Sequence, residues 1–141
     1  MSLLRVKKLD ERAADLIRAY EGDAGLDLHV LEETTIPPGE GVDVRTGIAV
    51  ALSDHCYGRV VGRSSALRRR GLLVVEGIID SGFRGELYSY AVNTTKEDVT
   101  LQSGDSIAQL IVSPIPYVTI MPVAELPDSQ RGENGFGSSG R

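Results

Sequence analysis

Apolar residues follow a helical period in one stretch of the chain, residues 11–20. The apolar positions of this stretch fall at i, i+3, i+4 and i+7, at Ala13, Leu16, Ile17 and Tyr20. Asp10 precedes the stretch as a predicted N-cap, and Gly22 follows it as a predicted end. The spacing therefore predicts one short helix near the start of the chain.

After residue 22 the pattern shortens to apolar runs separated by Gly, Pro, Ser and Asp, which is typical of an all-β sandwich or barrel. Strands are predicted over residues 26–31, 42–52, 57–61, 72–75, 86–93, 98–101, 107–112 and 117–121. We see no internal repeat of the length used by solenoids or propellers. Residues 127–141 are polar and glycine-rich around a single Phe136, so we expect a flexible C-terminal arm that holds no core position.

The composition fits one domain spanning residues 1–141. Of the 141 residues 41% are apolar, and a chain of this length buries roughly two thirds of its unfolded surface without disulfides or a structural metal. The single cysteine, Cys56, rules out an intramolecular disulfide, and with no basic, apolar leader the cytosol is the expected compartment. No apolar run approaches the roughly 18 to 20 residues of a membrane span, so no membrane association is expected.

The charge balance argues against nucleic acid as a partner. The net charge is −5, from 15 basic and 20 acidic residues, whereas phosphate backbones attract basic surfaces. The basic residues nevertheless gather in one region, at Arg59, Arg63, Arg68, Arg69 and Arg70. This region is either a solvated basic loop or a site for an anion.

Two segments combine glycine with groups that bind phosphate. In GRSSA, Arg63 with Ser64 and Ser65 offers a guanidinium and two hydroxyls at a turn, although Ser-Ser-Ala is also an ordinary helix start. In the tail segment RGENGFGSSG, glycines allow close backbone approach and Phe136 offers a flat face for stacking on a base. A disordered tail is the alternative interpretation of the second segment.

A third segment, GIIDSGFRGE, places Asp80 directly after an apolar run. An unperturbed Asp has a pKa near ~3.9 and is ionised at neutral pH, so this carboxylate can act on water as a general base. The structural alternative is an ordinary turn aspartate, which accounts for most Asp-Ser-Gly sequences.

Two further segments place one polar group beside strand-like residues. In AGLDL, Asp27 can approach metal-bound water; in GDSIAQL, Gln109 alternates with apolar neighbours and points a donor and an acceptor to one face. A structural role is the alternative for both, and Asp105 is a predicted turn former. Core or surface roles are expected for the residues that lack partners at metal-ligand or catalytic spacing, His29, His55 and Cys56.

Taken in order, these segments resemble the five motifs of the trimeric dUTPase family, the deoxyuridine triphosphate nucleotidohydrolases. They span about residues 23–140, and their order is more specific than any single motif. The resemblance implies a jelly-roll-like, all-β (β-clip) subunit in a homotrimer whose three active sites are shared between subunits. It also implies hydrolysis of dUTP to dUMP and pyrophosphate, which limits uracil in DNA and supplies dUMP for dTMP synthesis.

The resemblance further implies roles for individual residues. One subunit is expected to supply Asp27, Arg63, Ser64 and Gln109, a second the segment at residues 77–83, and a third the C-terminal arm. Asp80 is expected to activate the water that attacks the α-phosphorus, and Gln109 to position that water. Mg²⁺ is expected to be held mainly by the triphosphate and water, with Asp27 near it through water.

Substrate contacts follow from the same resemblance. The phosphates are expected to contact Arg63, Ser64 and Ser65 and, from the arm, Arg131, Gly137, Ser138 and Ser139. Phe136 is expected to stack on uracil, and Phe83 to pack against the deoxyribose and exclude a 2′-hydroxyl. The backbone of a hairpin at residues 72–79, with Gly77, Ile78 and Ile79, is expected to select the base.

The chain departs from the family pattern at a few positions. Phe83 stands where the family usually has Tyr, Leu26 where it commonly has Tyr, Ser65 where it often has Gly, and Ser106 where it often has Arg. The hairpin lacks an Asn that some members use on uracil and carries Glu76 near its turn. None of these departures removes an expected catalytic group.

Two alternative functions are open at this point. The segments GRSSA and IIDSGFRG closely resemble the corresponding segments of dCTP deaminases. However, the position expected to hold the catalytic glutamate of a deaminase is Ala91, which cannot transfer a proton. A dUTP-sensing regulatory protein that acts through a partner is the other alternative, although no partner-binding insertion is visible.

Overall fold

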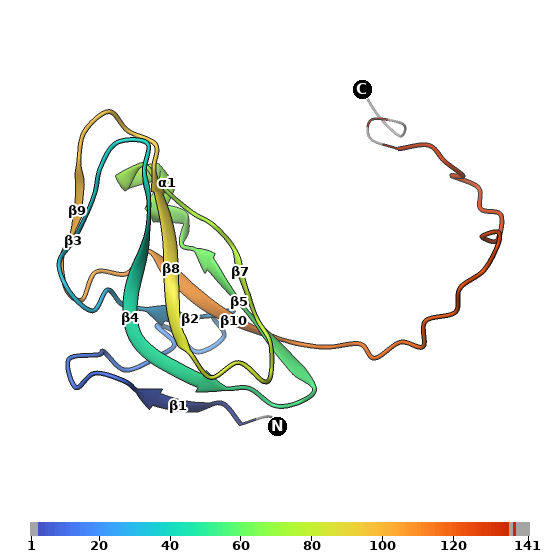
Figure 1. The fold of residues 1–141 in the computed structure, drawn as a ribbon, viewed down its shortest axis with the longest axis horizontal. Coiled ribbons are helices and arrows are strands. Elements are labelled where there is room, and N and C mark those ends of the chain that lie inside the picture. The colour runs from blue at the N-terminus through green and yellow to red at the C-terminus, as the bar shows by residue number, and fades with distance from the viewer. Residues whose placement is uncertain (1–2, 136, 138–141) are drawn as a thin grey trace.

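The computed structural model describes residues 3–135 and 137 and shows a mostly β structure with one short helix (Figure 1). One antiparallel sheet has the strand order β1 (Arg5–Lys8), β4 (Gly41–Ala51), β8 (Glu86–Asn93) and β6 (Leu72–Val74). Side chains alternate along β8, with Leu87, Ser89, Ala91 and Asn93 buried. This alternation is what a strand with one face against a core requires.

A second antiparallel sheet lies against the first and carries most of the sequence motifs. Its order is β2 (Gly25–Leu28), β10 (Ala108–Pro114), β5 (Cys56–Gly62) and β7 (Gly77–Ile79). A two-stranded sheet pairs β3 (Thr34–Ile36) with β9 (Val99–Leu101), and the helix α1 (Ser64–Arg70) follows β5. The expectation of an all-β architecture is therefore confirmed.

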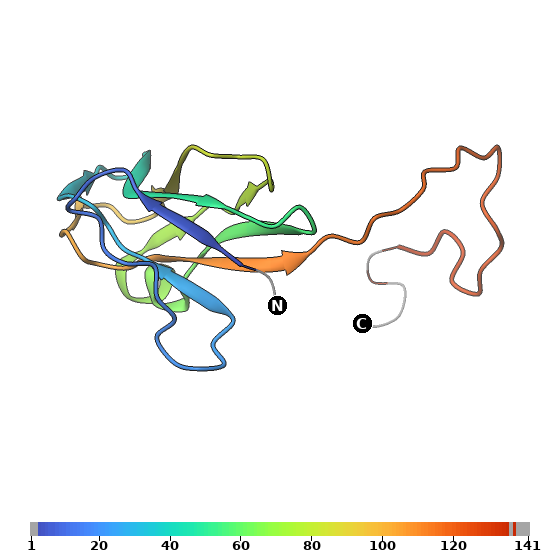
Figure 2. The ribbon, with the colours of Figure 1, turned by 90° about the horizontal axis from the view of Figure 1, so that it is seen from below.

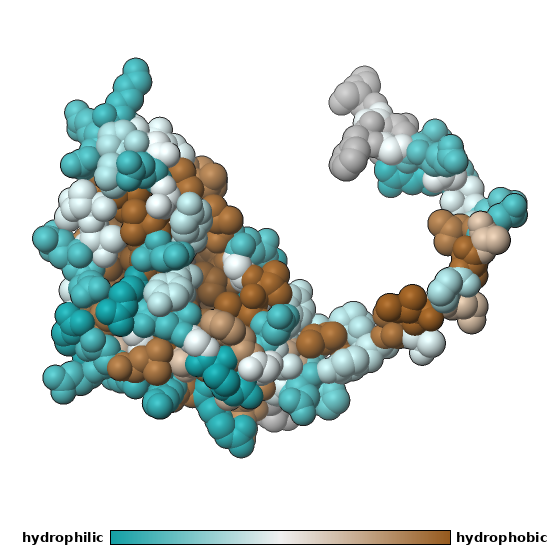
Figure 3. Space-filling view, in the orientation of Figure 1, coloured by the Kyte–Doolittle hydropathy of each residue, from teal (hydrophilic) through white to brown (hydrophobic). Residues whose placement is uncertain are grey.

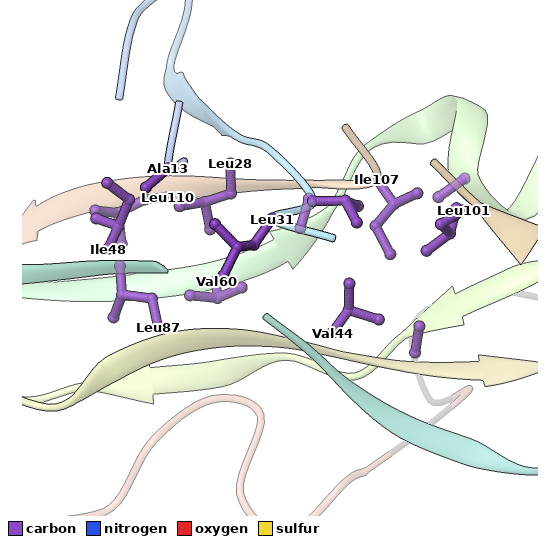
Figure 4. Close-up of a cluster of buried hydrophobic side chains, with 14 of the residues drawn as sticks. Ala13, Leu28, Leu31, Val44, Ile48, Val60, Leu87, Leu101, Ile107 and Leu110 are labelled. Atoms are coloured by element: carbon purple, nitrogen blue, oxygen red, sulfur yellow. The ribbon is translucent and has the colours of Figure 1, made fainter. Parts of the chain in front are cut away.

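The inner faces of the sheets share one hydrophobic core (Figure 4). The first sheet contributes Val44, Ile48 and Leu87, the second Leu28, Val60 and Leu110, and the small sheet Ile36 and Leu101. Because these side chains come from strands far apart in the sequence, the core joins the sheets into one unit.

Asn93 is a fully buried polar residue at the end of β8, and it has several hydrogen-bond partners. Its side-chain amide donates to the carbonyl oxygens of Ile36 at 2.8 Å and Glu97 at 2.7 Å. Its Oδ1 accepts from the Thr95 N–H at 2.8 Å and the Thr95 hydroxyl at 2.7 Å. One side chain thereby fixes the turn after β8 and attaches it to β3.

Most predicted strands are present, with small shifts at their ends. The prediction for β8 matches both bounds, and β4, β5, β6 and β10 each differ by one or two residues at an end. Strands β1 and β3 were not predicted. The predicted hairpin at residues 72–79 is formed differently, because β6 pairs with β8 in the first sheet and β7 pairs with β5 in the second.

The predicted helix at residues 11–20 is wrong. This stretch is irregular, and Asp10 caps a turn by accepting the Arg12 N–H at 2.9 Å. The Arg12 guanidinium, which donates to both oxygens of Asp10, holds the pKa of that carboxyl well below its usual range. Ala13 alone of the four periodic residues is buried, and it packs on Gly47, whose φ of 70° and missing Cβ let the two backbones approach.

The chain leaves the body after β10 and runs outward as an extended segment (Figures 1 and 2). Residues 116–135 are all exposed, so the segment begins earlier than residue 127, and the strand predicted at 117–121 is wrong. A strand needs a partner for its backbone groups, and Pro114 and Pro116 end the ladder of β10. We call residues 116–135 the arm. Its exposed apolar side chains include Val118, Ile120, Met121 and Leu126, and Figure 3 shows apolar patches along this segment.

In the part of the chain that the structure describes, no helix has both the length and the apolar character needed to cross a membrane. The helix α1 has seven residues.

Replacing Asn93 with Ala is expected to destabilise the fold by about 2–4 kcal/mol, because two carbonyls and one N–H then lose a buried partner. Urea unfolding followed by circular dichroism measures the change. Lys96→Ala, at an exposed position in the same turn, is the matched control and should stay within about 0.5 kcal/mol of the wild type. Equal stability of the two variants would contradict the assigned role of Asn93.

Candidate functional site

The central strand β10 presents one candidate residue on the outer face of the second sheet. Gln109 pairs in register with Asp27 of β2 on one side and with Val61 of β5 on the other. Its neighbours Ala108 and Leu110 are fully buried on the opposite face. The predicted alternation around Gln109 is therefore confirmed, and Gln109 and Asp27 lie side by side on one face.

The side chain of Gln109 lies over the backbone of Gly25. A Cβ at position 25 would overlap Gln109 Oε1 and would lie 2.7 Å from its Cδ. Glycine at this position thus leaves the space that the amide occupies. The AGLDL segment therefore contributes both the carboxylate of Asp27 and the room for its neighbour.

Arg63 joins this face to the loop that follows β5. Its Nε lies 3.7 Å from Asp27 Oδ1, and its Nη1 donates to the Ser106 carbonyl at 3.4 Å. Its backbone N–H donates to the Ile107 carbonyl at 2.8 Å. The side chains of Arg63 and Asp27 are about 40% and 18% exposed, so both remain accessible to a ligand.

The helix α1 holds the two serines of GRSSA, and an ion pair fixes its far end. Arg70 Nη2 lies 3.1 Å from Asp105 Oδ2. The same Asp105 oxygen accepts the Gln102 N–H at 2.9 Å, so the predicted turn former does close a turn. Ser64 is exposed and Ser65 half-buried, and both follow Arg63 directly.

A cavity of about 330 Å³ lies between α1 and β6, and Arg63 is part of its wall. Its polar lining is Arg63, Ser64 and Arg68, and its apolar lining includes Leu67 and Leu72–Val74. A second cavity of similar volume lies between β1 and β4, but Arg84 is the one motif residue that lines it. The first cavity is the one that continues the face formed by Asp27 and Gln109, because Arg63 belongs to both.

Asp80 lies at the start of an exposed turn after β7. Its carbonyl accepts the Phe83 N–H at 3.0 Å, and Arg84 Nη1 donates to the carbonyls of Ser81 at 2.7 Å and Phe83 at 3.0 Å. The ring of Phe83 lies over Gly85, where a Cβ would be 2.6 Å from Phe83 Cζ. The turn therefore holds an exposed carboxylate and a half-exposed ring in a fixed arrangement.

A single copy of the chain does not bring Asp80 to Gln109. Gln109 is level with Val61, whereas Ile79, the residue before Asp80, is level with Gly58. With about 3.3 Å per residue along a strand and about 4.8 Å between strands, Asp80 and Gln109 are on the order of 15 Å apart. Asp27, Arg63 and Gln109 thus form one group, and Asp80 with Phe83 forms another.

The segment before Asp80 is also tied to the second sheet. Gly77 and Ile78 pair with Val60 and Arg59 of β5, and Arg59 Nη1 lies 3.2 Å from Glu76 Oε1. Ile78 is exposed, while Gly77 and Ile79 are half-buried. The ladder to β5 gives the backbone of this segment a fixed geometry.

The arm does not reach either group within one chain. Arg131 Nε donates to the Asn134 carbonyl at 2.7 Å, so its described contacts lie within the arm itself. Gly137 lies in the same tail. The candidate residues Phe136, Ser138 and Ser139 lie outside the described residues.

Among residues 3–135 and 137 there is no cluster of three or more His, Cys, Asp or Glu side chains that can enclose a metal ion. Asp27 is a single carboxylate beside Arg63. This donor set fits Mg²⁺ that takes most of its ligands from phosphate and water, since Mg²⁺ retains several waters in such sites.

Sequence reasoning did not predict the structural roles of three residues that build this site. Gly25 makes room for Gln109, Arg70 anchors α1, and the Ser106 hydroxyl donates to the Leu28 carbonyl at 2.8 Å and so supports β2 beside β10. The glycine in AGLDL, which has no side chain, was a possible sequence signal for the role of Gly25. The other two depend on contacts between distant segments.

Comparisons with known proteins agree on one family. The family model described as dUTPase matches residues 11–140. The chain is 42% identical to the deoxyuridine 5′-triphosphate nucleotidohydrolase of Paramecium bursaria Chlorella virus 1, with 99% of each chain covered. It is also 42% identical to that of Clostridioides difficile, with 97% of each covered.

Solved structures with the same fold are also dUTPases. The dUTPase of Staphylococcus bacteriophage 80alpha, solved with dUPNHPP, superposes with a TM-score of 0.92 at 29% identity and covers 99% of both chains. A dUTPase from phage phi11 of S. aureus superposes with a TM-score of 0.82 at 25% identity over 87% of this chain and 97% of its own. The latter structure is described as revealing the coordination of a structural Mg(II) ion.

Proposed function

The chain belongs to the dUTPase family and is a dUTP diphosphatase, and we propose that Asp80 activates the water that attacks the α-phosphorus of dUTP. The water oxygen bonds to the α-phosphorus, the bond from that phosphorus to the α,β-bridging oxygen breaks, and pyrophosphate leaves with dUMP as the other product. Asp80 accepts the proton of the water. The observation that carries this proposal is the exposed carboxylate of Asp80 on a turn fixed by Arg84.

Asp27, Gln109 and Arg63 form the other half of the proposed site. Gln109 orients the attacking water through its amide, which is held above Gly25. Arg63, Ser64 and Ser65 bind phosphate oxygens, with the guanidinium as the strongest donor. Asp27 would hold Mg²⁺ through water, and the ion would neutralise charge on the phosphates.

We propose that the site is assembled in a homotrimer from three copies of the chain. The separation of Asp80 from Gln109 supports this, because a reacting phosphate must touch both groups. The exposed side chains of Leu73, Tyr88 and Tyr90 on the outer face of the first sheet also support it, because they have no cover in one chain.

In this trimer residues 127–141 of one copy close a site formed by the other two. The exposed apolar side chains at residues 118–126, which lead into this segment, support packing of the arm on a neighbour rather than on its own body. Arg131, Gly137, Ser138 and Ser139 contact the terminal phosphates, and Phe136 stacks on the base. By hydrolysing dUTP to dUMP in this assembled site, the protein limits uracil in DNA and supplies dUMP for dTMP synthesis.

Base and sugar selection fall to the segment before and after Asp80. The backbone of Gly77, Ile78 and Ile79, held by the ladder to β5, forms a rigid edge for uracil. Phe83 packs against the deoxyribose, since its ring is fixed over Gly85 and offers no hydrogen bond to a 2′-hydroxyl.

The two alternative functions are not favoured. The position expected to hold the glutamate of a dCTP deaminase, Ala91, is fully buried in the core. No observation on the described residues points to a dUTP-sensing role in place of hydrolysis.

Product analysis tests the function directly. Chromatography after incubation of the protein with Mg²⁺ and each of dUTP, dCTP, dTTP and UTP should show dUMP and pyrophosphate from dUTP alone. Deoxyuridine products from dCTP would indicate deamination. Hydrolysis of UTP at the same rate would show that Phe83 does not select the sugar.

Asp80→Asn should lower kcat for dUTP by about 10²- to 10⁴-fold, because the amide cannot accept a proton from water. The Kd for a non-hydrolysable dUTP analogue, measured by calorimetry, should change little. Ser81→Ala, at the adjacent turn position, is the control and should retain near wild-type turnover. A wild-type rate for Asp80→Asn would rule out the general-base role.

Mixed trimers test whether Asp27 and Asp80 of one site come from different chains. Asp27→Asn and Asp80→Asn chains, co-expressed with different tags and purified on both, form trimers that each contain one intact site. We expect each single variant to be nearly inactive and the mixture to recover about one third of wild-type activity. A site built within one chain predicts no recovery.

A further inference from the structure

The helix α1 ends in three consecutive arginines, and one of them already has a structural role. Arg70 pairs with Asp105 at 3.1 Å and fixes the end of the helix to the turn before β10. Within residues 3–135 and 137, neither the Arg68 nor the Arg69 side chain has a hydrogen-bond or ion-pair partner. Two exposed guanidinium groups are therefore available to a ligand from the same short helix.

The two available arginines differ in where they lie. Arg68 lines the cavity between α1 and β6, together with Arg63 and Ser64, whereas Arg69 is not among its lining residues. Arg68 is four residues after Ser64, so the two side chains share a face of the helix. Helical side chains lean toward the N-terminus, which directs the Arg68 guanidinium toward Ser64 and Arg63.

The cavity has the chemistry of an anion site with one apolar wall. Leu72–Val74 and Leu67 form the apolar wall, and the charged lining is two guanidinium groups. The lining contains no acidic side chain. Asp27 pairs with Arg63 at 3.7 Å from outside the lining, so Arg68 is the guanidinium that lacks a neutralising carboxylate. Two like charges beside one cavity repel each other, and an anion that enters between them removes this cost.

We propose that Arg68 is an additional substrate-binding residue that contacts the phosphate chain of the nucleotide beyond the part held by Arg63. The proposal rests on the proposed function of Arg63, Ser64 and Ser65 in phosphate binding. It deepens that function, because a second guanidinium raises the affinity for a triphosphate over that for the monophosphate product. The triphosphate substrate is thereby bound more tightly than dUMP, which carries less negative charge and is released after the reaction.

Binding measurements on the full-length protein test this proposal. Arg68→Gln should raise the Kd for an imido analogue of dUTP by about tenfold, because a charge-assisted hydrogen bond is lost. The Kd for dUMP should change by less than about twofold. Arg68→Lys should recover part of the affinity, because the charge remains. Arg69→Gln changes the net charge equally and should leave both constants near wild type.

The same variants separate the proposal from its premise. If Arg63→Gln weakens analogue binding and Arg68→Gln does not, Arg68 is no ligand although the phosphate site stands. If Arg68→Gln and Arg69→Gln weaken binding equally, a general field of the helix explains the effect and the contact is ruled out. An equal loss for dUMP and the analogue would also overturn it.

Discussion

The pairing of β10 with β2 on one side and β5 on the other is the constraint on which the candidate site depends. This register puts Gln109 between Asp27 and Val61 and puts Ala108 and Leu110 in the core. A shift by one residue would turn Gln109 into the core and two apolar side chains out to solvent. The same hydrophobic burial that holds the sheet together thus also fixes the polar face.

The division of the site into two groups follows from the width of the second sheet. Asp27, Arg63 and Gln109 gather where β2, β10 and the end of β5 meet, and Asp80 lies past the end of β7 near the opposite end of β5. Ladder hydrogen bonds hold Asp27 beside Gln109, and the ladder between β7 and β5 fixes where the turn that carries Asp80 begins. Assembly of several copies is therefore a geometric requirement of the proposed chemistry and not an addition to it.

The sequence predicted the mostly β fold class, because strand alternation and turn residues are local signals, and it named Asp27, Arg63 and Gln109, which the structure places together. The helix at residues 11–20 was wrong because Ile17 and Tyr20 are exposed, so their spacing does not mark a buried face. The strand at residues 117–121 was wrong because it has no partner within the chain. The separation of Asp80 from Gln109 depends on which strands pair and in what register, and no local pattern carries that information.

The edge strand β1 has a consequence for how the protein behaves at high concentration. All four of its residues are exposed, and three of them, Arg5, Lys7 and Lys8, are cationic. An open sheet edge invites pairing with another edge of its kind, but two β1 strands brought together repel each other. The charge on β1 therefore opposes pairing between the β1 edges of two molecules, which is one route to edge-to-edge growth into fibrils.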